Sequence, residues 1–432
     1  MRGTEIFQLL VGVGALAANT AAFSVVSPSF ASKIARNHDR ISSLAKNTKL
    51  YSSEGDNGIN SERFQALLRD LQIENVPILG CDADQVTTLM AATWTTMADL
   101  SERDGEEKVC LVMEKIPMGA LSAFVDDFSV LKLQPRLMAH LPELSRISVS
   151  LVGKDAGPAF VIEAAARTES EQAEKAKRVA GENVSQEKAE EAVRAFVQRS
   201  VIGENTCPYT KNVDMAPVAL EAKGVQSGPI GYRYGASSDA CAALATFWNN
   251  ICEVLGSTED VLSSTMLSLP AIGPGTSEEA HDRFAAVVEI IGRYLCLYRG
   301  DSLFGLVHFH PAYDRSKIFP LDKPAYGQLP PRSWLRPIIK LSGNDADSLT
   351  DEDLALSDYQ RRAPHTTINI LRVNQLNAAA GPNSIVDLEL EDGTTEKASG
   401  IATYSRNAIH LASIGKDALE QALQEEMAIL SA

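Results

Sequence analysis

The residues best suited to chemistry in this sequence begin with Cys207, in the stretch VIGENTCPYTKN. A cysteine followed directly by a proline and an aromatic residue is typical of a redox or nucleophilic thiol. If Pro208 is the first residue of a helix, the backbone N–H groups there stabilise a thiolate and lower the pKa of Cys207. A two-cysteine redox site is not predicted, because Thr210 stands where the second cysteine would be. The alternative is a half-buried cysteine in a tight turn.

A second group consists of His308 and His310, in LVHFHPAYD. Residues two apart on a strand face the same way, so both imidazoles are expected on one side. This spacing suits a metal site, whose further ligands would be Cys207, His365 or Asp314. Alternatively, His310 is a general base or a donor to a substrate near neutral pH. A third interpretation is a histidine at a strand end with its hydrogen bonds satisfied.

A third group consists of Arg361 and Arg362, which precede a proline and a threonine-rich strand in DYQRRAPHTTINILR. An arginine in a loop at the mouth of a sheet can bind a carboxylate or a phosphate through two parallel hydrogen bonds. Arg362 is therefore a candidate anion-binding residue. The alternative is a pair of solvated arginines on a loop.

Helices and short apolar strands alternate along the chain and must position these groups. Apolar residues at helical spacing predict helices at 61–72, 86–100, 120–131, 239–255 and 277–295. Short apolar runs predict strands at 108–116, 263–270 and 302–311, and a hairpin whose strands begin at 146 and 159. This alternation predicts an α/β fold.

The stretch 168–189 is rich in Glu, Lys and Ala, and we interpret it as a charged helical linker between two α/β units. The N-terminal unit spans 56–167 and the C-terminal unit spans 190–432. Trp94 and Trp248 fall at matching places in their helices, and an apolar strand with a proline–glycine exit follows each helix. An old duplication whose first copy lost its polar motifs would explain this, as would two units of similar rhythm. Unlike strand orders would refute the duplication.

Two segments of the C-terminal unit look inserted. Residues 314–353 form a long, proline-rich connection, which we expect to lie over or beside the site. Residues 377–398 contain VDLELEDGTTE, in which Asp-Gly predicts a hairpin turn.

The first 55 residues have the composition of a targeting segment. Residues 1–22 carry an early arginine, a short apolar run and then small residues, which is typical of a signal peptide. Residues 23–55 are rich in serine and basic residues, as in a transit peptide. A phenylalanine directly after the expected cleavage point resembles the two-part plastid presequences of diatoms and related algae. We therefore expect a plastid protein, with secretion as the alternative, and no membrane span in the mature chain.

Composition limits the classes of partner. The chain has 432 residues, of which 45% are apolar and 22% charged, as in globular proteins. Its net charge is −16, and this negative field repels phosphate backbones, so nucleic-acid binding is not expected. Six scattered cysteines without a CxxC pair argue against a disulfide framework and a four-cysteine zinc site. A small-molecule ligand is the expected partner, and no cofactor is assigned.

The three motifs stand in the order VIGENTCPY, FHPAY and RRAPHTTINILR. This order resembles domain-of-unknown-function family 1415, a mostly bacterial family whose members carry VIGLNLCPF, FHPDY and NRSPYPTLHLLRE. A later segment, 401–415, resembles the terminal helix of that family. The resemblance covers about residues 190–415 and implies a shared site, but no reaction, because the family has no established activity.

The resemblance implies a set of site residues in this chain, namely Asn205, Cys207, His310 and Arg362, with Arg372, Arg406 and Asn407 as weaker members. Three departures from the family pattern matter. Arg361 stands where the family has asparagine, His308 stands where a small residue is usual, and His365 replaces an aromatic residue. The family therefore does not imply the His-x-His metal site.

Three functions are compatible with these residues. In the first, a small-molecule enzyme, Cys207 is the nucleophile, His310 the base or electrophile, and Arg362 holds an anionic group of the substrate. This requires Cys207 and His310 to come within hydrogen-bond reach of each other. In the second, a non-catalytic protein binds an anion or nucleotide through Arg362 and backbone amides near Pro208. In the third, His308, His310 and Cys207 bind a metal.

Overall fold

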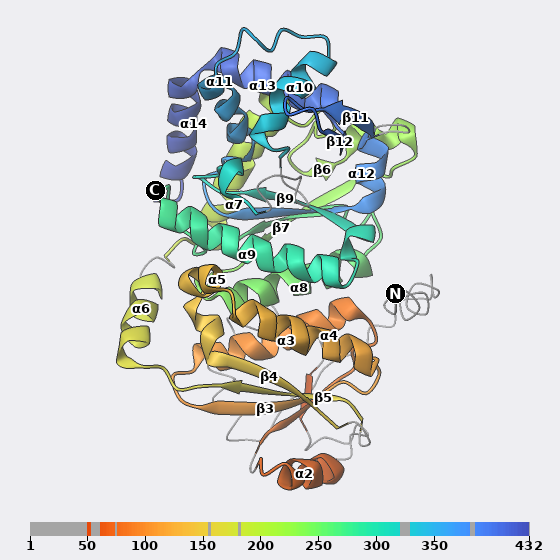
Figure 1. Cartoon of the computed structure of the whole chain (residues 1–432), viewed down its shortest axis with the longest axis vertical. Coiled ribbons are helices and arrows are strands. Elements are labelled where there is room, and N and C mark those ends of the chain that lie inside the picture. Colours follow the sequence, from red (N-terminus) through yellow and green to blue (C-terminus); the bar gives the residue numbers. More distant parts are fainter. Residues whose placement is uncertain are drawn as a thin grey trace.

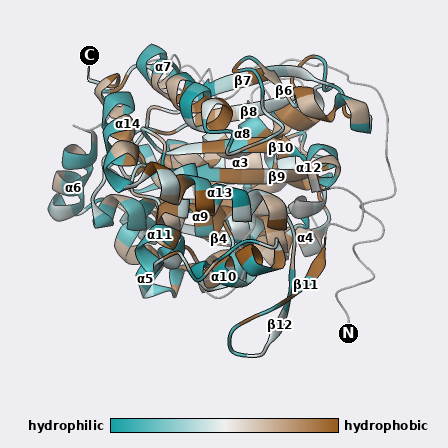
Figure 2. Cartoon of the chain, turned by 90° about the horizontal axis from the view of Figure 1, so that it is seen from above, coloured by the Kyte–Doolittle hydropathy of each residue, from teal (hydrophilic) through white to brown (hydrophobic). Residues whose placement is uncertain are grey.

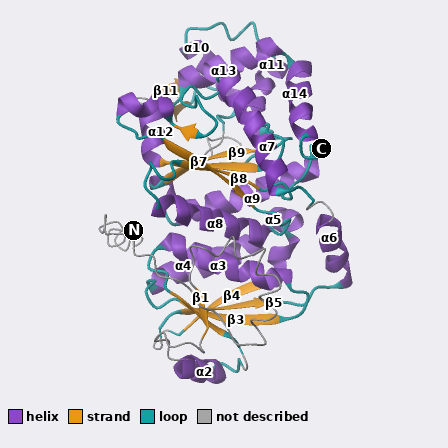
Figure 3. Cartoon of the chain, turned by 180° about the vertical axis from the view of Figure 1, so that it is seen from behind, coloured by secondary structure: helices purple, strands orange, loops and turns teal. Residues whose placement is uncertain are grey.

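The computed structural model describes residues 50–52, 61–73, 76–153, 157–179, 183–319, 329–380 and 385–431. Helices and strands are interleaved in these residues, so the predicted α/β class is confirmed. Ten of the strands in these residues form two five-stranded sheets, with helices stacked between them (Figures 1 and 3). The predicted signal peptide, and the transit segment apart from 50–52, lie outside the described residues.

The first sheet has the order β1-β2-β3-β5-β4, in which β2 and β3 are parallel and the other neighbours antiparallel. Its strands are β1 (Leu50–Ser52), β2 (Ile78–Cys81), β3 (Glu107–Val112), β4 (Ile147–Val152) and β5 (Ala159–Ala164). The predicted hairpin is confirmed as β4 and β5. The helical elements of this unit are α2 (Ser61–Asp70), α3 (Val86–Glu102), α4 (Met118–Lys132), α5 (Pro135–His140) and η1 (Pro142–Arg146).

The second sheet has the order β6-β7-β8-β10-β9. Its strands are β6 (Met215–Ala216), β7 (Gly228–Tyr234), β8 (Ser264–Ser268), β9 (Phe304–Phe309) and β10 (Thr367–Arg372). Helices α8 (Ala240–Gly256) and α9 (Glu278–Leu297) lie on the side of this sheet that faces the first unit (Figure 1). Both helices begin at side-chain caps, because Asp239 accepts from Cys241 N–H and Ser277 accepts from Ala280 N–H.

The two sheets share their strand order and strand directions. In each, the second and third strands are parallel and joined by a long helix, α3 or α8, and another long helix follows the third strand. The unlike order that would refute a duplication is therefore not found. Common origin itself stays a prediction.

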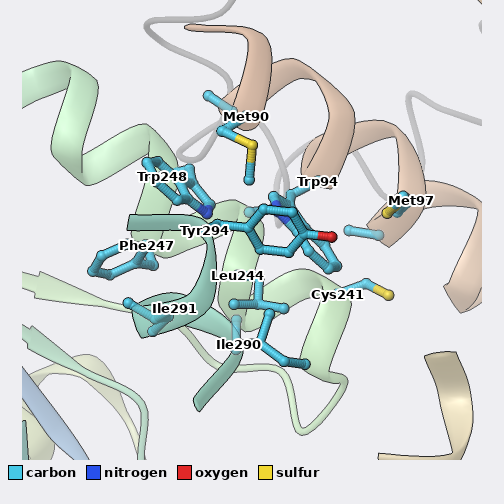
Figure 4. Close-up of a cluster of buried hydrophobic side chains, with 14 of the residues drawn as sticks. Met90, Trp94, Met97, Cys241, Leu244, Phe247, Trp248, Ile290, Ile291 and Tyr294 are labelled. Carbon is cyan, nitrogen blue, oxygen red and sulfur yellow. The ribbon is translucent and has the colours of Figure 1, made fainter. Parts of the chain in front are cut away.

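One apolar core lies between the sheets and draws side chains from both units (Figure 4). Trp94 of α3 packs edge-on against Tyr294 of α9, with ring centroids 5.9 Å apart. At the crossing of α3 and α8, Asn249 donates to the Thr95 hydroxyl at 3.0 Å. Burying an apolar side chain contributes about 1.5–3 kcal/mol. The two units are thus held together by a common core as well as by the linker.

The linker stretch is largely helical. Helix α6 (Glu169–Val179) lies at the side of the molecule, as Figure 1 shows, and is hydrophilic in Figure 2. Helix α7 (Gln186–Phe196) already begins inside the stretch predicted as linker. Its apolar face, with Val193 and Phe196, packs on Phe309 of β9 and so covers the second sheet on the side away from α9.

Helices α10 (Arg332–Leu341), α11 (Asp351–Ala355), α13 (Ile401–Ile414) and α14 (Lys416–Ala428) form an outer layer over the second sheet (Figure 3). The remaining elements are η2 (Val197–Gly203), η3 (Val218–Lys223), η4 (Gly300–Ser302), η5 (Arg315–Lys317), η6 (Leu356–Arg361), α12 (Val373–Ala380), β11 (Val386–Glu389) and β12 (Thr395–Ala398). Strands β11 and β12 form the hairpin predicted within 377–398, and it projects from the body in Figure 2. No helix in the described part of the chain is both long and apolar enough to cross a bilayer.

Candidate functional site

The loop that carries Cys207 is held by helix α13. The guanidinium of Arg406 donates to the carbonyl of Asn205 at 2.7 Å, and the amide of Asn407 donates to the carbonyl of Thr206 at 2.8 Å. Asn205 has a left-handed backbone, with φ of 53°, which asparagine tolerates better than most residues. Arg406 and Asn407, predicted to bind substrate, are thus engaged in positioning this loop.

No helix begins at Pro208. Residues 204–210 form bends and a turn, in which Thr210 N–H donates to the carbonyl of Cys207 at 3.4 Å. The predicted helix N-terminus at Cys207 is therefore wrong, and its thiol is instead in contact with the Thr210 hydroxyl at 3.4 Å.

The His310 imidazole is fully buried at the end of β9, and both of its nitrogens are engaged. Nδ1 accepts from Ala312 N–H at 3.0 Å, so Nε2 carries the proton and donates to the carbonyl of Gly273 at 2.7 Å. Burial lowers the pKa of His310 to about 3. The ring is therefore neutral near pH 7, and neither nitrogen is available as a base in this arrangement.

Cys207 and His310 lie on opposite faces of the second sheet. The His310 ring stacks on Phe284 of α9, with centroids 4.8 Å apart. Cys207 N–H donates to the carbonyl of Val201, whose side chain packs with α7 on the other face. A direct proton transfer between the two requires hydrogen-bond distance, which this placement does not provide.

Arg372 lies at the far end of β10 from this region. In the antiparallel pair, Thr367 is opposite Phe309 while Arg372 is opposite Phe304. Five residues of strand separate these ends by roughly 17 Å. The Arg372 guanidinium donates to three carbonyls at the end of α8 and just beyond it, at 2.6–2.8 Å. It therefore stabilises that helix end and does not take part in a site near His310.

The metal site predicted as an alternative, with His308, His310 and Cys207 as ligands, is not assembled in the described residues. Within the described ranges, no group of three or more His, Cys, Asp or Glu side chains could hold a metal ion. His308 is buried, with its pKa lowered to about 3 by burial and the nearby Arg361 charge. His365 is hydrogen-bonded through Nε2 to the carbonyl of Ala189 at 3.0 Å.

A pocket of about 480 Å³ opens where the loop after β9 meets the start of α9. The end of η6 and one face of α14 complete its wall. The charged and imidazole side chains in the wall are Glu278, His281, Asp314, Lys317, Arg362 and Glu420. Of the predicted site residues, Arg362 alone lines this pocket, while His310 lies behind it, its ring 5.6 Å from that of His281.

Two carboxylates in the wall already have cationic partners. Glu278 pairs with Lys317 at 2.5 Å, and Asp314 pairs with Arg332 at 2.8 Å. Burial alone raises the pKa of Asp314, but the hydrogen bonds from Ser316 and the charge of Arg332 outweigh it and lower that pKa. Both carboxylates are therefore ionised and neutralised within the wall near pH 7.

Arg362 differs from these groups because it has no acidic partner within the described ranges. Its Nε donates to the carbonyl of Tyr313 at 3.2 Å, and its guanidinium lies over the ring of Tyr359, 4.2 Å from the centroid. The Tyr359 hydroxyl donates to Glu420 at 3.1 Å. Among the described residues, no carboxylate forms a salt bridge with Arg362. The guanidinium is thus fixed in orientation and its charge is available to a ligand.

Hydrogen bonds connect the three sequence motifs. The side-chain amide of Asn407 also donates to Gln360 Oε1 at 2.9 Å, and His310 N–H donates to the carbonyl of Arg361 at 3.0 Å. These bonds tie the Cys207 loop, the end of β9 and the η6 segment together. Only the second and third motifs reach the pocket, through the loop after His310 and through Arg362.

His281 is the site residue that the sequence analysis missed. It lies in the first turn of α9, where its ring is 1% exposed, and it carries no recognisable motif. Its Nε2 accepts from Asp314 N–H at 3.2 Å, and its Nδ1 has no hydrogen-bond partner among the residues that the structure describes. The only signal in the sequence was a histidine within the predicted helix 277–295.

A comparison with protein-family models found no match to this chain, and comparisons with curated proteins and with solved structures found none either. Membership of domain-of-unknown-function family 1415 therefore stays a prediction, and the argument for function depends on the pocket itself.

Proposed function

We propose that the pocket binds a small anionic molecule and that Arg362 holds its anionic group. The observation that carries this proposal is the Arg362 guanidinium in the pocket wall, stacked on Tyr359 and without a carboxylate partner in the described part of the chain. An arginine that is already oriented loses little side-chain freedom when it binds a carboxylate or phosphate.

The surrounding charges indicate that an anionic ligand would be bound by a specific contact with Arg362 and not by long-range electrostatic attraction. The chain as a whole carries −16, so an anion is repelled at long range. Within the wall, Lys317 is paired with Glu278 and cannot compete for the ligand without breaking that pair. The binding energy must therefore come largely from Arg362 and from neutral donors close to it.

The proposal does not require Cys207. A reaction between Cys207 and His310 has less support, because these residues lie on opposite faces of the sheet and both His310 nitrogens are occupied. The second function considered from the sequence, anion binding by Arg362, agrees better with the geometry. The backbone amides near Pro208 do not belong to the pocket wall.

The test is calorimetric titration of the full chain with inorganic phosphate, acetate and citrate, before and after Arg362→Gln. Hydrogen bonds to a charged group contribute about 1.5–3 kcal/mol, so we expect the substitution to weaken binding by roughly 10- to 100-fold. Arg336→Gln is the matched control, because Arg336 is a half-buried arginine outside the pocket wall that pairs with the exposed Asp351. Equal binding by wild type and Arg362→Gln, or loss of binding in the control, would contradict the proposal.

A further inference from the structure

We infer that the molecule held by Arg362 is a zwitterion of the amino-acid class, whose carboxylate binds the Arg362 guanidinium and whose ammonium group binds the carboxylate of Glu420. The inference rests on the proposed function and narrows its ligand. Two opposite charges in the same pocket wall carry it, because each contacts the side chain of Tyr359 and the two are not paired with each other.

Helix α14 positions Glu420 in the pocket wall. Glu420, Leu423 and Gln424 stand at positions i, i+3 and i+4, which lie on one face of a helix, and all three line the pocket. The same helix is anchored by the buried Leu419, which packs in one apolar cluster with Tyr359. The carboxylate of Glu420 therefore has a fixed place relative to the ring of Tyr359.

The side chain of Tyr359 holds both charges. The Arg362 guanidinium lies over the face of the ring, 4.2 Å from the centroid, and the hydroxyl of the same ring donates to Glu420 at 3.1 Å. Burial raises the pKa of Tyr359 to about 12, so the hydroxyl keeps its proton near pH 7 and remains a donor. A cation and a carboxylate are thus presented side by side on one rigid ring.

The charge of Glu420 is available to a ligand. In the described part of the chain, its salt-bridge partner is Lys416, whose Nζ lies 3.6 Å away and whose side chain is 67% exposed. A lysine one turn N-terminal to a glutamate is the weaker order for such a pair, and exposed pairs contribute little. The other carboxylates of the wall, Glu278 and Asp314, each have a closer cationic partner.

The pairing of Arg362 with Glu420 in one wall disfavours a simple anion. An anion on Arg362 would lie near the Glu420 carboxylate, because both groups contact Tyr359, and like charges repel most strongly where water is partly excluded. An ammonium group on the same ligand converts this repulsion into attraction. An amino acid therefore satisfies both side chains, whereas a phosphate or a simple carboxylate satisfies Arg362 alone.

The pocket also has room for the carbon chain of an amino acid. Its volume of about 480 Å³ lies within the range of small-molecule sites. Pro311, Ala312 and Leu423 add apolar surface to a wall that is otherwise polar. The pocket can thus hold the two charged groups together with an aliphatic side chain.

The experiment titrates the full chain at pH 7 by calorimetry with butyrate, L-α-hydroxybutyrate, L-α-aminobutyrate and γ-aminobutyrate. The two amino acids differ in the separation of their charges, and the hydroxy acid supplies a neutral hydrogen bond in place of the ammonium. We expect at least one amino acid to bind about 10-fold more tightly than butyrate, the effect of one hydrogen bond between charged groups, and the hydroxy acid to bind like butyrate. Binding of both amino acids within about twofold of butyrate would overturn the inference.

Glu420→Gln tests the residue that would hold the ammonium group. We expect it to weaken binding of the preferred amino acid by about 10-fold and to leave butyrate binding unchanged or stronger, because a like charge is removed. A structural disturbance of the wall would weaken both ligands, so equal losses would overturn the inference. Glu425→Gln is the matched control, because Glu425 is an exposed glutamate of the same helix outside the pocket wall. An equal effect of the control on amino-acid binding would also overturn it.

The outcomes separate this inference from the proposed function. Butyrate binding that depends on Arg362, with no preference for an amino acid, leaves the proposed function standing and refutes the zwitterion. Amino-acid binding that is unchanged in Arg362→Gln refutes both, as does the absence of binding by all four compounds.

Discussion

Replacing Glu143 with glutamine tests whether the two units are held together by a buried ion pair. Glu143 lies in η1 of the first unit, and its side chain is fully buried. Its Oε1 accepts from Arg283 of α9 at 2.5 Å and from the N–H of Ala240, the first residue of α8, at 2.7 Å. One carboxylate therefore binds two helices of the second unit.

The size of the expected destabilisation follows from the loss of the carboxylate partner of Arg283. Removing one partner of a buried pair costs about 3–5 kcal/mol, because the other charge stays buried without compensation. Arg283 also donates to the carbonyls of His140 and Ser238, and glutamine keeps an acceptor for Ala240. We therefore expect Glu143→Gln to lower the free energy of unfolding by about 3 kcal/mol, the lower end of that range.

The measurement is urea unfolding followed by circular dichroism and tryptophan fluorescence. Glu253→Gln is the matched control, because Glu253 also pairs with an arginine, Arg233, but both side chains are about one third exposed, so that removing the pair should cost less than removing a fully buried one. A loss below about 0.5 kcal/mol for Glu143→Gln, or a loss equal to that of the control, would refute the reasoning.

Lowering the pH should remove the stabilisation that the Glu143–Arg283 pair contributes. Burial alone raises the pKa of Glu143, but the charge and hydrogen bond of Arg283 outweigh it and hold the pKa below its ordinary value of 4.5. Because the pKa is depressed in the folded state, the stabilisation is present above pH 4.5 and is lost as the pH falls through the folded pKa. The difference in the free energy of unfolding between wild type and Glu143→Gln should therefore become smaller below about pH 4.5.

Three further predictions concern the histidines, the thiol and the presequence. Burial lowers the pKa of His281 to about 4 and those of His308 and His310 to about 3, so below about pH 6.5 the unfolded chain binds protons that the folded chain does not. These three groups should lower the free energy of unfolding by about 4 kcal/mol per pH unit between pH 6 and pH 5, and a flat stability in urea over that range would contradict their burial as neutral rings. Cys207→Ala and Cys207→Ser should leave the affinity for L-α-aminobutyrate within about twofold of wild type by calorimetry, since Cys207 is not in the pocket wall, and a loss comparable to that of Arg362→Gln would place the thiol in the site. A fluorescent fusion of residues 1–60, expressed in a diatom, should reach the plastid, and labelling confined to the secretory pathway would favour secretion.

The pattern of apolar residues was enough to predict much of the fold. The helices at 86–100, 239–255 and 277–295 and the hairpin of β4 and β5 were recovered to within a few residues. Helical and strand periodicities are local properties that record which face of an element is buried. Short strands such as β2 were missed, because four residues carry too little pattern to identify a strand.

The site was predictable only in part. Arg362 was identified from its place in a loop before a strand, and the structure puts it in the wall of the pocket. Arg372 follows five residues after Thr367 on the same strand, so its distance from the other motif residues could have been foreseen from the strand rise. His281 belongs to no motif, and its proximity to Asp314 arises from contacts between segments 33 residues apart.

The sequence by itself determined the α/β class, the position of the long helices and the candidate cation Arg362. The tertiary structure alone decided which side chains meet. His310 and Cys207 belong to adjacent motifs, yet strand pairing turns the His310 ring toward α9 while α13 holds the Cys207 loop on the opposite face. The local pattern of apolar residues encodes which face of a helix or strand is buried. Which side chains come together in a site depends on the pairing of segments that are far apart in the sequence. The pocket of Arg362 and His281 is for that reason a property of the fold and not of any motif.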